Sequence, residues 1–410
     1  MMPRFAQPST LSINSSSSQS KITVEEPVSE LDSEMANKIN MKCKDMLLEY
    51  EQMQNLDDII YSLSEDETSV IRTNHDEFVK SMSLITLDSN PTNRTTVVGK
   101  IFAKLLSKRI LSKEAITRGI DAVLKDWNDY LMDYPQFFSY IAAIIAPLLL
   151  LQTAFFDFNN LKDCCTSIRP DNSPKFFIEV LNTILSSVVT QNINEERGGI
   201  LWIYNKWLAS EYVPLGIFMP DNQINKYFEN DRIGAFILSI AMYDKLKMTD
   251  SRVVFNIFHS WISTNISAEI IKYPQFVRAL TIAIVIESLN SKRSYEDFFN
   301  HVHMKLLTYY IWSEPLPEPE IQAREVQCLY GMQIISAALK YPRGMVLRLF
   351  HKIYQNSVLS KESFEIWKKD DNFNAGFVED LETKTMTVLV LNPFFMSLQP
   401  NDSDEDKTTK

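Results

Sequence analysis

The sequence predicts an all-α protein assembled as a solenoid of helical hairpins. Apolar residues recur at a period near 3.6 along most of the chain, which is the spacing of one helix face. Only 9 of the 410 residues are glycine, 45% are hydrophobic, and no segment has a convincing strand pattern. A chain of this length can form two to three domains. Two short motifs occur twice, as stacked hairpins would predict: Asp133-Tyr134-Pro135-Gln136-Phe137 matches Lys272-Tyr273-Pro274-Gln275-Phe276, and Leu111-Ser112-Lys113-Glu114 matches Leu359-Ser360-Lys361-Glu362.

The composition excludes several classes of function. A formal net charge of -11 argues against nucleic acid as the main ligand, because phosphate binding needs a basic surface. The four cysteines form no CxxC pair and are expected to be reduced, structural thiols. No positively charged segment followed by an apolar core is seen at the N-terminus. We therefore expect a cytoplasmic protein whose partners are basic protein surfaces.

The composition of both ends of the chain predicts disorder. Residues 1–34 are rich in Ser, Pro and Gln, and residues 400–410 form an acidic tail. From Met35 the apolar residues follow helical spacing, so a first helical domain is expected over residues 35–212. Glycines and prolines interrupt the pattern near residues 213–231, which predicts a junction.

The first domain contains an uncharged run from Phe137 to Phe156, about 20 residues and long enough for a membrane span. Pro147 lies inside the run, polar residues interrupt it, and both flanks are acidic. We therefore expect two packed core helices broken at Pro147 and no contact with a membrane.

Helix ends are marked by capping residues and prolines. Ser112 and Ser360 each precede Lys-Glu and an apolar stripe, as an N-cap does. The helix after Ser112, with Trp127 on its buried face, should end before Tyr134, and Pro135 should open the next helix. A second helical domain is expected over residues 232–399, with an extended, solvated loop around Pro315, Pro317 and Pro319.

No catalytic motif, phosphate-binding loop or cofactor site is present, so the chain is not expected to be an enzyme. His301 and His303 favour packed or surface histidines over a metal site. Asp129 and Asp133 are four residues apart near a helix end, where the two charges repel each other and oppose the helix dipole. Two readings stay open: Asp133 caps the next helix, or the pair anchors an Arg or Lys of a partner.

Residues 35–212 resemble an MA-three domain, the HEAT-type helical module of initiation factor 4-gamma. The resemblance rests on Ile101-Phe102-Ala103-Lys104-Leu105-Leu106, on Gly119-Ile120, and on Asp129-Tyr130-Leu131-Met132-Asp133-Tyr134-Pro135, which has the family's D-x-x-x-D-x-P pattern. It implies binding to the DEAD-box 4A helicase, with Asp129, Asp133 and Tyr134 as contact residues.

The second part is similar to the C-terminal HEAT domain found in the same factor and in its death-associated relative, which carries two aromatic and acidic boxes. The first box matches Ser360-Lys361-Glu362-Ser363-Phe364-Glu365-Ile366-Trp367, and the second matches Phe394-Phe395-Met396-Ser397-Leu398 with Asp402, Asp404, Glu405 and Asp406. The resemblance implies partner contacts through Glu362, Trp367, Phe394, Phe395 and the four acids. Gln355, Asn356 and Ser357 replace the usual acids of the first box, and Ser397 replaces the tryptophan of the second.

The resemblance implies two HEAT-type helical-hairpin solenoid domains in tandem and a non-enzymatic adaptor in translation initiation. The second domain would bind a kinase of the cap-binding protein or initiation factor 2 subunits. Two alternatives stay open: a competitive regulator that lacks the family's middle domain, and a structural subunit of another assembly. We also expect Phe394 and Phe395 to form an exposed, adhesive strip.

Overall fold

The computed structural model describes residues 33–65, 70–88, 91–168, 170–186, 199–228, 232–248, 254–290, 299–312, 315–371 and 375–398. The described residues contain α-helices and short 3-10 helices and no strand, which confirms the predicted all-α class. Predictions for residues 1–32 and 399–410 fall outside the described residues. The α-helices are α1 (Ser33–Met53), α2 (Leu56–Glu65), α3 (Val70–Thr73), α4 (His75–Asp88), α5 (Pro91–Ser107), α6 (Lys113–Lys125), α7 (Trp127–Asp133), α8 (Phe137–Leu149), α9 (Phe158–Cys164), α10 (Ser173–Ser186), α11 (Gly199–Ala209), α12 (Ile224–Phe228), α13 (Arg232–Met248), α14 (Val254–Asn265), α15 (Ala268–Lys272), α16 (Pro274–Asn290), α17 (His301–Trp312), α18 (Glu318–Ala338), α19 (Met345–Gln355), α20 (Lys361–Lys369), α21 (Val378–Val390) and α22 (Asn392–Ser397).

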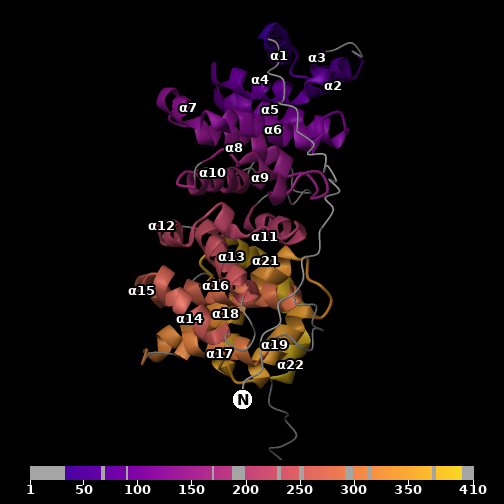
Figure 1. Cartoon of the computed structure of the whole chain (residues 1–410). Helices are drawn as coiled ribbons and strands as arrows, with labels where there is room; N and C mark the ends of the chain where they lie inside the picture. The colour runs from indigo at the N-terminus through magenta and orange to yellow at the C-terminus, as the bar shows by residue number, and fades with distance from the viewer. Residues whose placement is uncertain are drawn as a thin grey trace, which may run out of the picture.

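The helices stack as packed pairs along an elongated body, with α1 at one end and α17, α19 and α22 toward the other (Figure 1). The closest pairs are α4 with α6, α5 with α8, α13 with α16, and α16 with α18. Each pair buries one face against its neighbours, as expected for HEAT-type helical hairpins.

Glycines permit two of these close approaches. A Cβ on Gly99 of α5 would lie 2.6 Å from the carbonyl oxygen of Ile144 in α8. A Cβ on Gly331 of α18 would lie 2.9 Å from the carbonyl oxygen of Arg278 in α16. Both distances are too short for any side chain, so these helix pairs depend on glycine.

The uncharged run forms α8 and the turns that follow it. Phe137, Phe138, Ile141 and Ile145 are fully buried, so the run is core, as predicted. The predicted break at Pro147 is wrong, because Pro147 lies inside the last turn and the helix continues to Leu149. No helix among the described residues is long and apolar enough to cross a membrane.

The helix ends agree in part with the predictions. Ser112 caps α6 and Ser360 caps α20, each through its hydroxyl, which confirms both N-caps. The predicted single helix before Tyr134 is wrong, because it divides at Asp126 into α6 and α7, and half-buried Trp127 begins α7. Pro135 lies in a turn and does not open α8, which begins at Phe137.

Prolines elsewhere mark helix starts more closely. Pro274 is the first residue of α16. Pro317 is the N-cap of α18, and Pro319 lies in the first turn of that helix, so only part of the predicted proline loop is extended. Proline is well suited to this position because the first helical N–H groups have no acceptor within the helix.

The segment between the two halves is packed into the core. It contains two 3-10 turns, η2 (Leu215–Ile217) and η3 (Asp221–Gln223), followed by α12. Phe218 stacks on Phe177 of α10 at 4.5 Å between ring centroids, and Trp207 of α11 meets Phe236 of α13 at 5.6 Å. Buried side chains therefore form one continuous cluster from α1 to α22. The predicted domain boundaries stay a prediction.

Candidate functional site

The acidic corner, defined as Asp126, Asp129 and Asp133, lies on and beside α7. Helix α7 is seven residues long, has no buried residue, and lies at the outer edge of the stack (Figure 1). Asp126, Asp129 and Asp133 are exposed, and Met132 is 72% exposed. The structure thus presents two carboxylates and an apolar side chain to solvent on one short helix, with a third carboxylate at the residue before it.

Two aromatic contacts hold this helix against the start of α8. The Tyr130 ring stacks on Phe137 at 5.2 Å between centroids, and Trp127 meets Phe138 at 6.2 Å. Burial raises the pKa of the Tyr130 hydroxyl, and the nearby charges of Asp126 and Asp129 raise it further. The aromatic residues fix the position of the helix and leave its carboxylates free to face outward.

The structure argues against a capping role for Asp133. Gln136 occupies the N-cap of α8 and makes no side-chain cap hydrogen bond, whereas Asp133 is the last residue of α7. None of the three corner carboxylates forms a side-chain hydrogen bond or ion pair with another described residue. Tyr134, the remaining predicted helicase-contact residue, is half-buried. Unpaired carboxylates on an exposed helix can anchor the Arg or Lys side chains of a partner.

The aromatic boxes of the second half are core. Trp367 and Phe394 are fully buried and Phe395 is 5% exposed, so the prediction of an exposed strip at Phe394 and Phe395 is wrong. Helix α22 packs against α19 and α21, which places Phe394 5.8 Å from Phe350 and stacks Phe395 on Trp367 at 6.3 Å. Tyr354 and Phe364 join the same aromatic cluster, and burying these rings together removes more apolar area from water than leaving a strip exposed.

The structure describes only one of the acidic residues predicted to contact a partner through the boxes. Glu362 is exposed in the first turn of α20 and remains accessible to a partner. Asp402, Asp404, Glu405 and Asp406 lie outside the described residues. Of the four described box residues predicted to contact a partner, Glu362, Trp367, Phe394 and Phe395, only Glu362 is on the surface.

Sequence reasoning missed a buried polar network centred on Arg278. Its guanidinium donates to Gln327 at 2.7 Å, to the Ala375 carbonyl at 2.6 Å and to both carboxylate oxygens of Asp380 at 2.9 and 3.1 Å. Arg278 is 2% exposed and Asp380 is fully buried. The sequence did hold one indication of this network: Arg278 is a charged residue among the apolar residues of α16, and a buried charge needs a partner.

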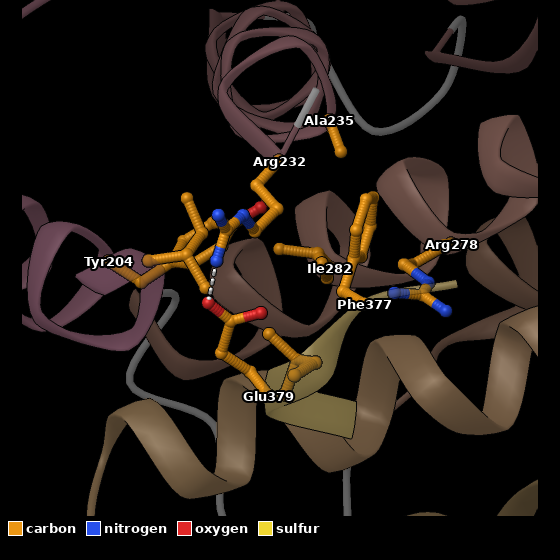
Figure 2. Close-up of a pocket in the computed structure, with 9 residues that line it drawn as sticks. Tyr204, Arg232, Ala235, Arg278, Ile282, Phe377 and Glu379 are labelled. Carbon is orange, nitrogen blue, oxygen red and sulfur yellow. Dashed lines mark hydrogen bonds and ion pairs between the residues drawn. The ribbon is translucent and has the colours of Figure 1, made fainter. Parts of the chain in front are cut away.

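The same network reaches the first box, and a second ion pair lies beside it. Gln333 accepts from the indole N–H of Trp367 at 3.1 Å and donates to the backbone carbonyl of Asp380 at 2.6 Å. Beside it, Arg232 of α13 pairs with Glu379 of α21, and Phe377 lies against Arg278 (Figure 2). The cavity between these residues has a volume of about 20 Å³, room for about one water molecule and no larger ligand. The network stabilises the fold.

One member of the histidine pair packs into the fold, and the other is on the surface. His303 is buried, its Nε2 lies 3.0 Å from a Glu287 carboxylate oxygen and its Nδ1 lies 3.3 Å from the Ser288 hydroxyl. His301 is exposed. Within the described ranges, no cluster of His, Cys, Asp and Glu residues could hold a metal ion.

Comparisons with known proteins relate the chain to one group of initiation factors. No protein-family model matches it. It is 21% identical over 319 residues to eukaryotic translation initiation factor 4 gamma 3 of Mus musculus, and the alignment covers 73% of this chain and 19% of that protein. It is 22% identical over 283 residues to eukaryotic translation initiation factor 4 gamma 1 of Mus musculus, covering 66% of this chain and 17% of that protein. The chain therefore spans about a fifth of the length of these relatives and is distantly similar to them.

Proposed function

We propose that this chain is a non-enzymatic adaptor in translation initiation. Its distant similarity to initiation factors 4 gamma over about two thirds of its length supports the process. The helical-hairpin fold supports the role, because stacked hairpins offer extended surfaces for protein partners.

The first half binds the DEAD-box 4A helicase through the acidic corner. The observation that carries this step is the exposed, unpaired pair Asp129 and Asp133 on a helix held in place from behind by Tyr130 and Trp127. Two like charges at this spacing cost stability in the free protein. A basic partner removes that cost and gains charge-assisted hydrogen bonds.

Measuring the affinity of the purified full chain for the helicase tests this contact. The double variant Asp129→Ala/Asp133→Ala removes both carboxylates, and each lost charge-assisted bond costs about 1.5 to 3 kcal/mol. We expect affinity to fall on the order of a hundredfold or more. The matched control is Asp45→Ala/Glu49→Ala, an exposed pair with the same spacing on α1.

The control variant should bind the helicase like the parent chain. Equal affinity of the Asp129/Asp133 variant and the parent would refute the assigned contact. A parent chain that binds no helicase would favour the alternative, a structural subunit of another assembly.

The second half binds a further partner through acids and not through its aromatic box residues. Trp367, Phe394 and Phe395 are in the core, so Glu362 is the described box residue left to make the contact. The resemblance adds the acidic residues Asp402, Asp404, Glu405 and Asp406, which lie outside the described residues. A kinase of the cap-binding protein and initiation factor 2 subunits are the candidate partners. Glu362→Lys should weaken capture of the true partner, whereas Lys361→Glu, a charge change at the neighbouring exposed position, should not.

A further inference from the structure

One face of α21 in the second half is apolar, and no other helix of the described residues covers it. Four of its thirteen residues are large, exposed hydrophobic side chains: Val378 (65% exposed), Leu381 (37%), Met386 (48%) and Leu389 (68%). The opposite face of the helix packs on α18, α19 and α22. The uncovered face also carries exposed Glu382 and Thr385. At about 100° per residue, Val378, Glu382, Thr385 and Leu389 fall along one line of the helix, with Leu381 on one side and Met386 on the other.

The order of apolar and polar positions on this face is symmetric about the middle of the helix. Val378 and Leu389 are equally far from the midpoint between Thr383 and Lys384, and so are Glu382 and Thr385. If a second α21 lies antiparallel on the first about a two-fold axis at this midpoint, each Val378 meets Leu389 of the second copy. Each Glu382 then faces a Thr385 hydroxyl, which can donate to it, and no two carboxylates face each other. Leu381 and Met386 flank this line, and each meets its own counterpart near the axis.

We propose that two copies of this chain associate through α21 as an antiparallel, two-fold symmetric pair. Such an interface is isologous, so one self-complementary surface serves both copies. The exposed apolar surface comes from four side chains of one thirteen-residue helix, so it is small for a protein–protein interface. A standard interface buries roughly 800 Å² per partner. The pair is therefore reversible, with a dissociation constant in the micromolar range or weaker.

Sedimentation velocity of the full chain measures this association. We expect reversible dimerisation between roughly 1 μM and several hundred μM, the range suited to an interface this small. Leu389→Glu places a charge in the apolar contact of both copies and should weaken the dimer about a hundredfold or more. Met41→Glu, a substitution of a similarly exposed residue on α1, should leave it unchanged. Thr385→Lys should tighten it about 2-fold to 30-fold at low salt, through two new pairs with Glu382.

Cysteine cross-linking tests the register. The four natural cysteines are buried and form no disulfide, so new surface thiols would react first. A mixture of Val378→Cys and Leu389→Cys chains should form an intermolecular disulfide under mild oxidation, and either variant alone should not. Circular dichroism verifies that the variants fold. A monomer at every concentration, cross-linking of either variant alone, or an α21 face that binds only a different protein would each overturn the proposal.

Discussion

Replacing Arg278 with methionine should destabilise the protein strongly, because it leaves a buried carboxylate without its partner. Arg278 makes four hydrogen bonds, two of them to Asp380, and both residues are almost fully buried. Breaking such a pair on one side costs about 3 to 5 kcal/mol. Replacing both members with apolar residues costs less, because neither charge is then left buried without its partner.

The losses of unfolding free energy in the two single variants are therefore not expected to add up in the double variant. Arg278→Met and Asp380→Leu should each lower the free energy of unfolding by about 3 to 5 kcal/mol, and the double variant should lose clearly less than the sum. Urea titration followed by circular dichroism measures all four proteins. The control is Glu365→Ala, which breaks an exposed pair with Lys369 and should change stability by about 0.5 kcal/mol or less.

The pH dependence gives an independent check. Burial raises the pKa of Asp380 to about 6, even though Arg278 lowers it. Without Arg278 this pKa rises further, so the folded variant keeps a proton that the unfolded chain releases above about pH 4. The stability lost by Arg278→Met should therefore be smaller at pH 5 than at pH 8. Additive single effects, or a loss that grows as the pH falls, would refute the reasoning.

Three further predictions concern packing, capping and thiols. Gly99→Ala should lower the free energy of unfolding by about 1 to 3 kcal/mol in thermal or urea denaturation, since a Cβ there meets the backbone of α8, whereas Gly216→Ala, whose Cβ meets nothing within 4 Å, should be nearly neutral. Ser112→Ala should cost about 0.5 to 2 kcal/mol for the lost N-cap, and Ser360→Ala should cost more, because its hydroxyl also binds a buried glutamate; equal losses would contradict this. Burial raises the pKa of all four cysteine thiols, so iodoacetamide should label them only after unfolding, as mass spectrometry can measure.

The two caps show what sequence can and cannot predict. The motif Leu-Ser-Lys-Glu predicts both N-caps correctly, because capping depends only on residues within one turn. The motif says nothing of Glu325, which lies 35 residues before Ser360 and accepts from both its backbone N–H and its hydroxyl. That contact depends on how α18 and α20 pack. Local chemistry is therefore readable from sequence, and contacts between distant helices are not.

The two candidate sites also differ in whether local sequence or long-range packing determines their exposure. Asp129 and Asp133 are exposed as a partner site requires, because charged residues on a short edge helix stay in water without help from the rest of the fold. Phe394 and Phe395 follow a proline near the end of the helical part of the chain and could have been surface or core. The packing of α22 against α19 and α21 buries these two side chains. A single sequence does not predict this packing between helices.

The continuous core changes how the proposed partners must be assigned to each half. A cut anywhere within residues 213–231 would separate Trp207 from Phe236, and a cut before Phe218 would also separate Phe218 from Phe177, on which it stacks. Each fragment would then expose aromatic side chains that bind other proteins without specificity. Point variants of the whole chain avoid this problem, because the acidic corner and Glu362 are exposed, and their loss disturbs no buried contact. A partner lost only with Asp129 and Asp133 belongs to the first half, and one lost only with Glu362 belongs to the second.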